Sequence, residues 1–170
     1  MIRYSLRETS LGWLLVAETD EGVIRVAFAD APGRLESEFH AEWVPRGATA
    51  RAQTVQESAD AVLAAVEEPL RAGKLLETLP VAWRGSAFQR DVWQSLRRIP
   101  VGETTTYSRL ASVLGRSGAA RAVGGAVAAN AVAVVVPCHR VVRADGSVGG
   151  FRWGHGRKRA LLEREGAAPR

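Results

Sequence analysis

Two short helices joined by a tight turn are the feature that most constrains the fold of this chain. Thr105 or Thr106 can cap a helix over 107–114, which ends at Gly115. The turn 116–118 then leads into a second helical stretch over 119–129. This spacing predicts a helix-turn-helix.

The second of these helices has very little side-chain bulk. Alanine and glycine fill most of it, and Arg121 carries its only charge. Each glycine inside a helix costs about 1 kcal/mol relative to alanine, so Gly124 and Gly125 need a reason. Close packing inside the protein is one explanation. In the other, Ala122 and Gly125 approach a DNA minor groove and Arg121 enters the base stack. Asn130 ends the helix, which predicts a capping role.

The helix-turn-helix lies in a larger segment that we expect to form a domain over 81–170. Ser86 and Gln89 have capping-box spacing, which predicts a helix that stops before Pro100. A last helix is expected over 157–164.

Residues 1–80 are expected to form a small α/β unit. Its strands are predicted over 13–18 and 23–29, with a hairpin turn at 19–22. A weak helix is predicted around 35–42, and a stronger one over 55–67 opens on a capping box at Thr54.

Charge separates the same two segments. Residues 1–80 hold 8 Lys/Arg and 13 Asp/Glu, whereas residues 81–170 hold 15 Lys/Arg and 5 Asp/Glu. A basic half joined to an acidic half favours a polyanionic partner, namely nucleic acid, for the basic half alone.

Cys138 is the only cysteine, and it follows the apolar run 131–136, for which we expect a buried strand or extended segment. A lone cysteine is usually structural. Here His139 and Arg140 come next, and positive charge nearby lowers the pKa of a thiol and favours the nucleophilic thiolate. The loop 149–154 is aromatic and basic and suits a planar ligand. Glu165 follows the last helix, a position where a glutamate is usually solvated.

Several classes of protein are not expected. No stretch approaches the roughly 20 apolar residues of a membrane span, and the first residues lack the pattern of a signal peptide. One cysteine and three scattered histidines do not predict a disulfide or a cysteine-rich zinc site. We therefore expect a cytoplasmic protein without metal or other cofactor.

The motifs of the basic half together resemble the O6-alkylguanine-DNA alkyltransferase family. The similarity covers nearly all of that half and lies closest to the carboxy-terminal module of the bacterial adaptive-response proteins, without their zinc domain. It rests on Phe88-Gln89, Val92-Trp93, Ile99-Pro100, 102–104, Tyr107, 121–123, 129–130, 137–141, 152–154, Leu161-Leu162 and Glu165.

The resemblance implies a ribonuclease-H-like α/β amino-terminal domain and a mostly helical, winged helix-turn-helix-like domain. It also implies repair of double-stranded DNA that carries O6-alkylguanine and, less efficiently, O4-alkylthymine. The base is flipped out of the duplex, and its alkyl group moves irreversibly to the cysteine. Some members of the family carry a structural zinc site, which one cysteine does not predict here. For this chain we expect a monomer without metal or cofactor, of which several copies can occupy one DNA.

The same resemblance implies a role for each matching residue. Cys138 is the nucleophile, His139 takes its proton through a water, and Glu165 orients His139. Tyr107 donates toward the base and steers the phosphate. Arg121 fills the place in the stack that the flipped base leaves, and the further DNA contacts are Ala122, Gly125 and Arg140. Asn130 braces the recognition helix against the active-site segment. The residues that line the guanine pocket are Val141, Phe151, Arg152 and Trp153.

One position departs from the family pattern, because Phe151 stands where a tyrosine is usual and lacks its hydroxyl. Two alternatives use the same segments: a non-enzymatic alkyl-lesion-binding protein of the same fold, and an unrelated helix-turn-helix regulator. Related lesion sensors lack the reactive cysteine, so Cys138 argues against the first. The Cys-His pair argues against the second.

Overall fold

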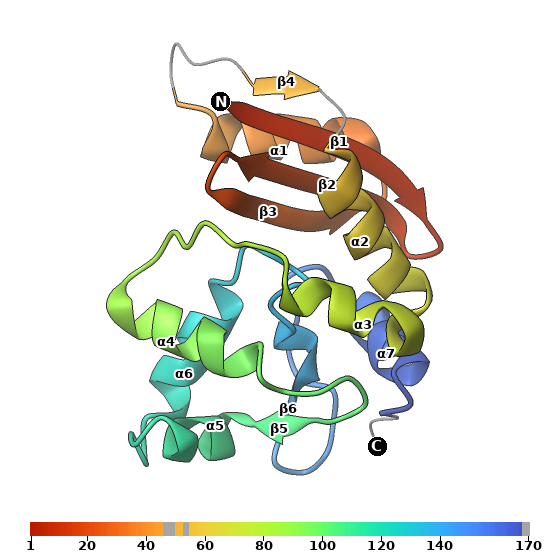
Figure 1. Cartoon of the computed structure of the whole chain (residues 1–170). Helices are drawn as coiled ribbons and strands as arrows, with labels where there is room; N and C mark the ends of the chain where they lie inside the picture. Colours follow the sequence, from red (N-terminus) through yellow and green to blue (C-terminus); the bar gives the residue numbers. More distant parts are fainter. Residues whose placement is uncertain (46–49, 53–54, 168–170) are drawn as a thin grey trace. The chain divides into compact units, whose positions relative to one another are not determined.

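The structure is a computed structural model that describes residues 1–45, 50–52 and 55–167. The chain divides into two compact units, Met1–Trp83 and Arg84–Arg170 (Figure 1). This division falls shortly after the boundary expected at residue 80. No helix within the described ranges has the length and apolar character needed to cross a membrane.

A four-stranded sheet forms the centre of the first unit. In the order β3-β2-β1-β4, its strands are β3 (Gly22–Ala29), β2 (Gly12–Thr19), β1 (Ile2–Thr9) and β4 (Ala50–Ala52). β1, β2 and β3 form an antiparallel meander with a bulge between Ala17 and Glu18, and β4 pairs parallel to β1. The strands β2 and β3 match the predicted ranges. β1 was not predicted, although Ile2, Tyr4 and Leu6 alternate with polar residues as in a half-buried strand.

Helices cover both faces of this sheet, as two neighbours on β1 demonstrate. The ring of Tyr4 packs against that of Phe39 of α1 (Pro32–Trp43), with the ring centroids 5.2 Å apart. The Oγ of Ser5 accepts a hydrogen bond from the amide of Val55, the residue before α2 (Gln56–Glu67). Successive strand residues point to opposite faces, so α1 and α2 lie on opposite sides. Leu14, Leu15, Val16 and Ala17 of β2 are consequently all buried.

The hairpin turn between β2 and β3 requires glycine for two reasons. Gly22 has φ +128°, and a Cβ there would lie 2.6 Å from the carbonyl oxygen of Pro80. The amide of Val23 donates to that same carbonyl, and Ala82 donates back to the carbonyl of Val23. Residues 80–82 thereby cover part of the outer edge of β3, which would otherwise be open to pairing.

One helix of the first unit was not predicted from the sequence, and one predicted feature is not tested. A further helix, α3 (Pro69–Glu77), follows α2, because Pro69 occupies the first turn of a new helix as well as ending the old one. The capping box predicted at Thr54 falls outside the described residues.

The second unit is mostly helical. It comprises α4 (Ala87–Leu96), β5 (Thr105–Thr106), α5 (Tyr107–Val113), α6 (Ala120–Ala128), the 3₁₀ turn η1 (Cys138–Arg140), β6 (Val141–Val142) and α7 (His155–Arg164). Ser86 and Gln89 form both halves of the predicted capping box. Thr106 accepts a hydrogen bond from the amide of Arg109 and caps α5, as predicted. The predicted fold class, a small sheet unit followed by a mostly helical unit, is confirmed.

The helix-turn-helix is held against α4 by a tryptophan. Trp93 is buried and donates its indole N–H to the carbonyl of Ala126 at 2.8 Å. Its ring also packs so closely on Gly85 that a Cβ there would lie 2.5 Å from it. These contacts fix α6 next to α4, while the parallel pair β5–β6 brings the start of α5 beside η1.

The run 131–136 is not the strand or extended segment that its apolar composition predicts. It forms a buried turn in which Val134 takes a φ of +67° and Val136 donates to the carbonyl of Val132. Positive φ is strained for a β-branched residue. Asn130 supports the turn, because its Oδ1 accepts from the amide of Val132 and its Nδ2 donates to the carbonyl of Val136.

Candidate active site

A cleft of about 420 Å³ opens within the helical unit, and Cys138 lies in its wall. Its lining is largely apolar and comes from α5, α6, η1 and the loop before α7, a composition typical of small-ligand sites. The residues that line it are Tyr107, Gly124, Val127, Ala128, Asn130, Cys138, Gly150, Phe151, Arg152 and Trp153.

The thiol of Cys138 is held by the side chain of Asn130. The Nδ2 of Asn130 donates to the Sγ atom at 3.1 Å and to the carbonyl of Val136 at 3.0 Å. Asn130 directly follows α6, so one buried amide joins that helix to the turn that carries the thiol. Asn130 directly follows the C-cap residue Ala129, and its backbone N–H donates to the carbonyl of Val127, although it lacks the positive φ of a typical asparagine cap. Its side chain bonds forward to 132–138.

The sequence-based expectation that basic neighbours lower the pKa of Cys138 is also wrong. Burial dominates and raises the pKa of the thiol, because the thiolate loses its hydration. The hydrogen bond from Asn130 and the charge of Lys158 oppose this effect without cancelling it. Cys138 is thus a thiol at rest, and its proton must be removed for it to act as a nucleophile.

His139 is placed to be a neutral base. It is fully buried, and its Nε2 lies 2.8 Å from Oε1 of Glu165. Burial lowers the pKa of His139, although the Glu165 carboxylate acts in the opposite direction. If Nε2 carries the proton toward the carboxylate, Nδ1 is left as an acceptor. Nδ1 has no hydrogen-bond partner within the described part of the chain.

Glu165 is the buried anion of the site, not the solvated residue that its position in the sequence favours. Burial alone would raise the pKa of Glu165, but hydrogen bonds from His139 and Arg140 outweigh it and hold that pKa at about 2. The carboxylate therefore stays ionised at neutral pH and fixes the histidine ring.

Arg140 does not occupy the DNA-contact position expected for it. Its side chain is 9% exposed. Its Nε and Nη2 donate to the two oxygens of Glu165 at 2.9 Å, and its Nη1 donates to the carbonyl of Ile99. A bidentate pair of this kind is short and directional. Arg140 thus neutralises Glu165 and ties the active-site turn to the end of α4.

Tyr107 opens α5 and lines the cleft beside Gly124 and Gly149. It is half-buried, and burial raises the pKa of its hydroxyl, with a further contribution from Cys138. The hydroxyl therefore remains protonated at neutral pH and is available as a donor in the cleft.

The exposed face of α6 carries most of the residues expected at DNA. Arg121, Ala122, Gly125 and Ala128 are exposed, while Val123, Ala126 and Val127 are buried. The two glycines differ in what surrounds them. A Cβ at Gly124 would touch the Tyr107 ring at an ordinary 3.7 Å, whereas a Cβ at Gly125 would meet no heavy atom within 4 Å among the described residues. Packing within the described protein therefore gives no reason for Gly125.

The loop before α7 supplies the outer wall of the cleft. Phe151 and Trp153 stack edge to face at 5.2 Å, and Trp153 is buried while Arg152 is exposed. All three line the cleft, as expected. Val141, the fourth expected pocket residue, is fully buried and is not among the lining residues.

Sequence reasoning missed Lys158, the most deeply buried cation of the second unit. It is fully buried in α7, where its neighbours Arg157 and Arg159 are basic as well. Only the tertiary structure reveals that this side chain points inward. Among the described residues, no group of three or more His, Cys, Asp or Glu side chains is placed to hold a metal.

The chain is similar in sequence to several known proteins. A family model described as the DNA-binding domain of 6-O-methylguanine DNA methyltransferase matches residues 87–167. The chain is 43% identical over 168 residues to the bifunctional transcriptional activator/DNA repair enzyme Ada of Escherichia coli, covering 96% of this chain and 45% of Ada. It is 50% identical over 92 residues to a methylated-DNA–protein-cysteine methyltransferase of Shigella flexneri, covering 54% of each. The chain spans about half the length of the curated relatives it matches.

Solved structures extend the likeness to both units. Mycobacterium tuberculosis OGT, crystallised in complex with DNA, is 34% identical with a TM-score of 0.77, covering 98% of this chain and 95% of that one. The O6-methylguanine-DNA methyltransferase of Pyrococcus kodakaraensis is 29% identical with a TM-score of 0.74, covering 98% and 99%. The chain therefore belongs to the O6-alkylguanine-DNA alkyltransferase family.

Proposed function

We propose that this protein repairs O6-alkylguanine in double-stranded DNA by moving the alkyl group, once and irreversibly, onto Cys138. O4-alkylthymine is a second, poorer substrate. The observation that carries the proposal is the buried chain of contacts from Asn130 to Cys138 and from His139 to Glu165, set in a cleft of suitable size. This is the nucleophile, base and orienter arrangement of covalent catalysis.

The transfer proceeds in one displacement. The proton of Cys138 passes to the imidazole of His139, by way of a water as in the family, and Glu165 stabilises the resulting imidazolium. The Sγ atom then forms a bond to the alkyl carbon as the bond from that carbon to O6 breaks. The electron pair stays on O6 of the guanine, which takes a proton from the Tyr107 hydroxyl, and the proton held by the His139 imidazolium then returns the Tyr107 phenolate to its neutral form. In net terms the thiol proton ends on guanine, and a stable thioether remains.

The substrate reaches the thiol only as a flipped base, because Cys138 lies in the wall of a cleft. The exposed face of α6 supports this role through its small residues, Ala122 and Gly125, and its single cation, Arg121. Arg121 occupies the stack that the base vacates. Flipping costs a few kcal/mol and least for a weakly paired lesion, which contributes to selectivity.

The cleft accepts the flipped guanine between Tyr107 and the loop 150–153. Phe151 offers a ring face for stacking but no hydroxyl, so recognition at that position is apolar. No metal or cofactor takes part in the proposed reaction. We propose that the protein acts as a monomer in the cytoplasm, on nucleoid DNA, and that several copies can occupy one duplex.

One labelling experiment tests the proposal. Duplex DNA with a labelled O6-methyl group should transfer at most one label per chain, and the label should lie on Cys138. Cys138→Ala should abolish transfer and leave duplex binding nearly unchanged. Repeated turnover or label on another residue would contradict the mechanism. Binding with no transfer at all would instead favour the lesion-binding or regulatory alternative.

A further inference from the structure

Lys158 is a buried cation for which the proposed reaction has no use. Its side chain is fully buried, although lysine is almost never fully buried unless it is paired. No carboxylate is recorded within hydrogen-bonding distance of its Nζ in the described structure. An ammonium without such a partner normally costs several kcal/mol to bury, so its retention needs an explanation.

The ammonium bonds to two backbone segments that meet at the cleft. Its Nζ donates to the carbonyl of Val141 at 2.5 Å and to the carbonyl of Gly150 at 3.0 Å. Val141 follows the turn that carries Cys138, and Gly150 begins the loop that forms the outer wall of the cleft. One side chain on α7 thereby sets the spacing between the thiol and the opposite wall.

The same ammonium acts electrostatically on the thiol. Among the described residues, Lys158 is the cation whose charge favours the thiolate of Cys138, and the thiolate in turn favours the charged form of Lys158. Burial lowers the pKa of Lys158 to about 8, while Cys138 acts in the opposite direction. At neutral pH the side chain is therefore mostly charged, and it gains further protonation when the thiolate forms. An ammonium has three donors, and the two carbonyls occupy only two.

The other charged groups near Lys158 and Cys138 have partners of their own. Arg140 is bonded to Glu165, which also pairs with His139. The charge of Lys158 also acts on His139 and lowers its pKa, and Arg143 acts on Lys158 and on the neutral Tyr107. The side-chain charges of His139 and Arg140 therefore do not favour the thiolate of Cys138, whereas the hydrogen bond from Asn130 and the charge of Lys158, twenty positions away, do.

We propose that Lys158 is a positioning residue that fixes the cleft wall and holds a positive charge near Cys138. The charge lowers the free energy needed to form the thiolate inside a buried site. This inference deepens the proposed function and rests on Cys138 as the reacting group. It requires no DNA for its test, because a small reagent can report on the thiol directly.

The test follows the pH dependence of Cys138 alkylation by iodoacetamide, which is specific because the chain has one cysteine. In Lys158→Met we expect the midpoint of the profile to rise by about 1 to 3 pH units, as for removal of a neighbouring opposite charge. Labelling at neutral pH should then fall about tenfold or more, and a high-pH plateau should be retained. Lys158→Arg keeps the charge and should retain most of the wild-type midpoint.

The matched control is Lys74→Met, which removes the only other lysine, an exposed residue of α3. Its profile should superimpose on that of the wild type. An unchanged midpoint in Lys158→Met, or a uniform loss of rate at every pH, would overturn the inference and leave Lys158 a purely structural residue. If Lys158→Met does not fold, Lys158→Gln, which is neutral but keeps two N–H donors, gives the same comparison.

The outcome is separable from that of the proposed function. A shifted iodoacetamide profile together with no methyl transfer from DNA would support the role of Lys158 and refute alkyl repair. Methyl transfer by the wild type together with an unshifted profile in Lys158→Met would do the reverse.

Discussion

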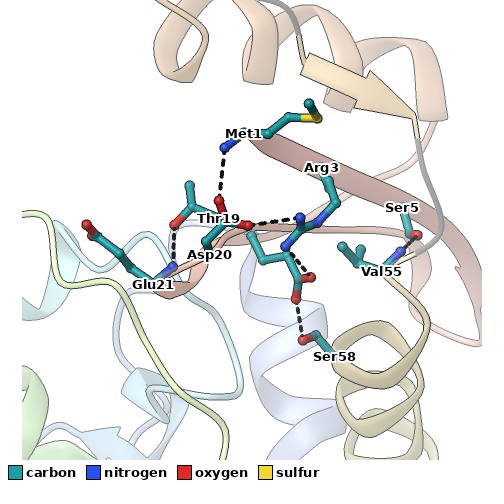
Figure 2. Close-up of polar contacts among 9 residues, drawn as sticks. Met1, Arg3, Ser5, Thr19, Asp20, Glu21, Val55 and Ser58 are labelled. Carbon is teal, nitrogen blue, oxygen red and sulfur yellow. Dashed lines mark hydrogen bonds and ion pairs between the residues drawn. The ribbon is translucent and has the colours of Figure 1, made fainter.

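The two units of this protein use the same polar groups in opposite ways. In the sheet unit, the amino terminus and Arg3 bond to Asp20, whose side chain is 72% exposed (Figure 2). In the helical unit, Glu165 bonds to His139 and Arg140 and is 3% exposed. Surface pairs contribute little, since water and salt screen them, whereas a buried pair is costly to break. The free energy of unfolding should therefore depend strongly on the partners of a buried charge and little on those of an exposed one.

The sheet unit also shows how polar residues are buried without function. Ser5 of β1 accepts from the amide of Val55, and Ser58 of α2 donates to Glu18 of β2 (Figure 2). These bonds satisfy backbone and side-chain groups at the sheet surface. In the helical unit, the Nδ1 of His139 is buried and has no hydrogen-bond partner among the described residues, and it belongs to the residue next to Cys138.

The largest effect should come from removing the buried carboxylate. Glu165→Ala leaves Arg140 and His139 buried without their acceptor, so we expect the free energy of unfolding to fall by about 3–5 kcal/mol. Asp20→Asn in the sheet unit is the control and should leave the urea midpoint nearly unchanged. Comparable losses for the two variants would remove the distinction drawn between the units.

Acid should destabilise the protein mainly through the helical unit. The folded pKa of Glu165 is about 2, below its ordinary 4.5, so its contribution is complete above about pH 4.5 and is lost as the pH falls toward 2. The size is on the order of 3 kcal/mol. His139 acts in the same direction, because its lowered pKa makes the unfolded chain bind protons first.

Urea unfolding followed from pH 7 to pH 2.5 measures this acid sensitivity. Glu165→Gln should be less stable at pH 7 and show a shallower loss below pH 4.5. An equally steep loss in that variant would assign the acid sensitivity to other groups.

The arginine on α6 should affect DNA repair without affecting the chemistry. Arg121→Ala should slow methyl transfer from duplex DNA by about tenfold or more, because flipping costs a few kcal/mol that an inserted side chain offsets. The rate with a free O6-alkylguanine base should stay within about twofold. Parallel losses on both substrates would refute the stacking role and point to a damaged cleft.

The smallest effect is expected when a helical glycine of each unit is replaced by alanine and the stability and duplex binding of the two variants are compared. Gly125→Ala should stabilise α6 by up to about 1 kcal/mol, since no neighbour opposes a methyl group there, and yet weaken duplex binding. Gly33→Ala in α1 also enters open space and should leave duplex binding unchanged. Unweakened binding in Gly125→Ala would show that the helix backbone does not approach DNA closely.

Local signals predicted the helical unit well. Ser86 with Gln89, and Thr106 before α5, satisfy backbone amides within a few residues, so their effect is independent of the rest of the fold. β1 and α3 were missed although local signals for both exist. Ile2, Tyr4 and Leu6 alternate with polar residues, and Pro69 can begin a helix as well as end one.

The site was predicted less completely than the fold. Cys138, His139, Glu165, Tyr107 and Asn130 were named from their match to a family, and the structure brings them to one cleft or its immediate backing. Their electrostatics were misread. Arg140 is next to the thiol in sequence, but its guanidinium bonds to Glu165, and burial raises the pKa of Cys138.

The sequence by itself determined the helices and caps of the second half, the basic character of that half and the single thiol that it contains. These follow from periodicity, caps and residue type, which act over short distances. Only the tertiary structure decided which charges face Cys138, that 131–136 turns instead of extending, and that Lys158 is buried. Burial and charge–charge contact depend on packing between distant segments, and no local pattern records them.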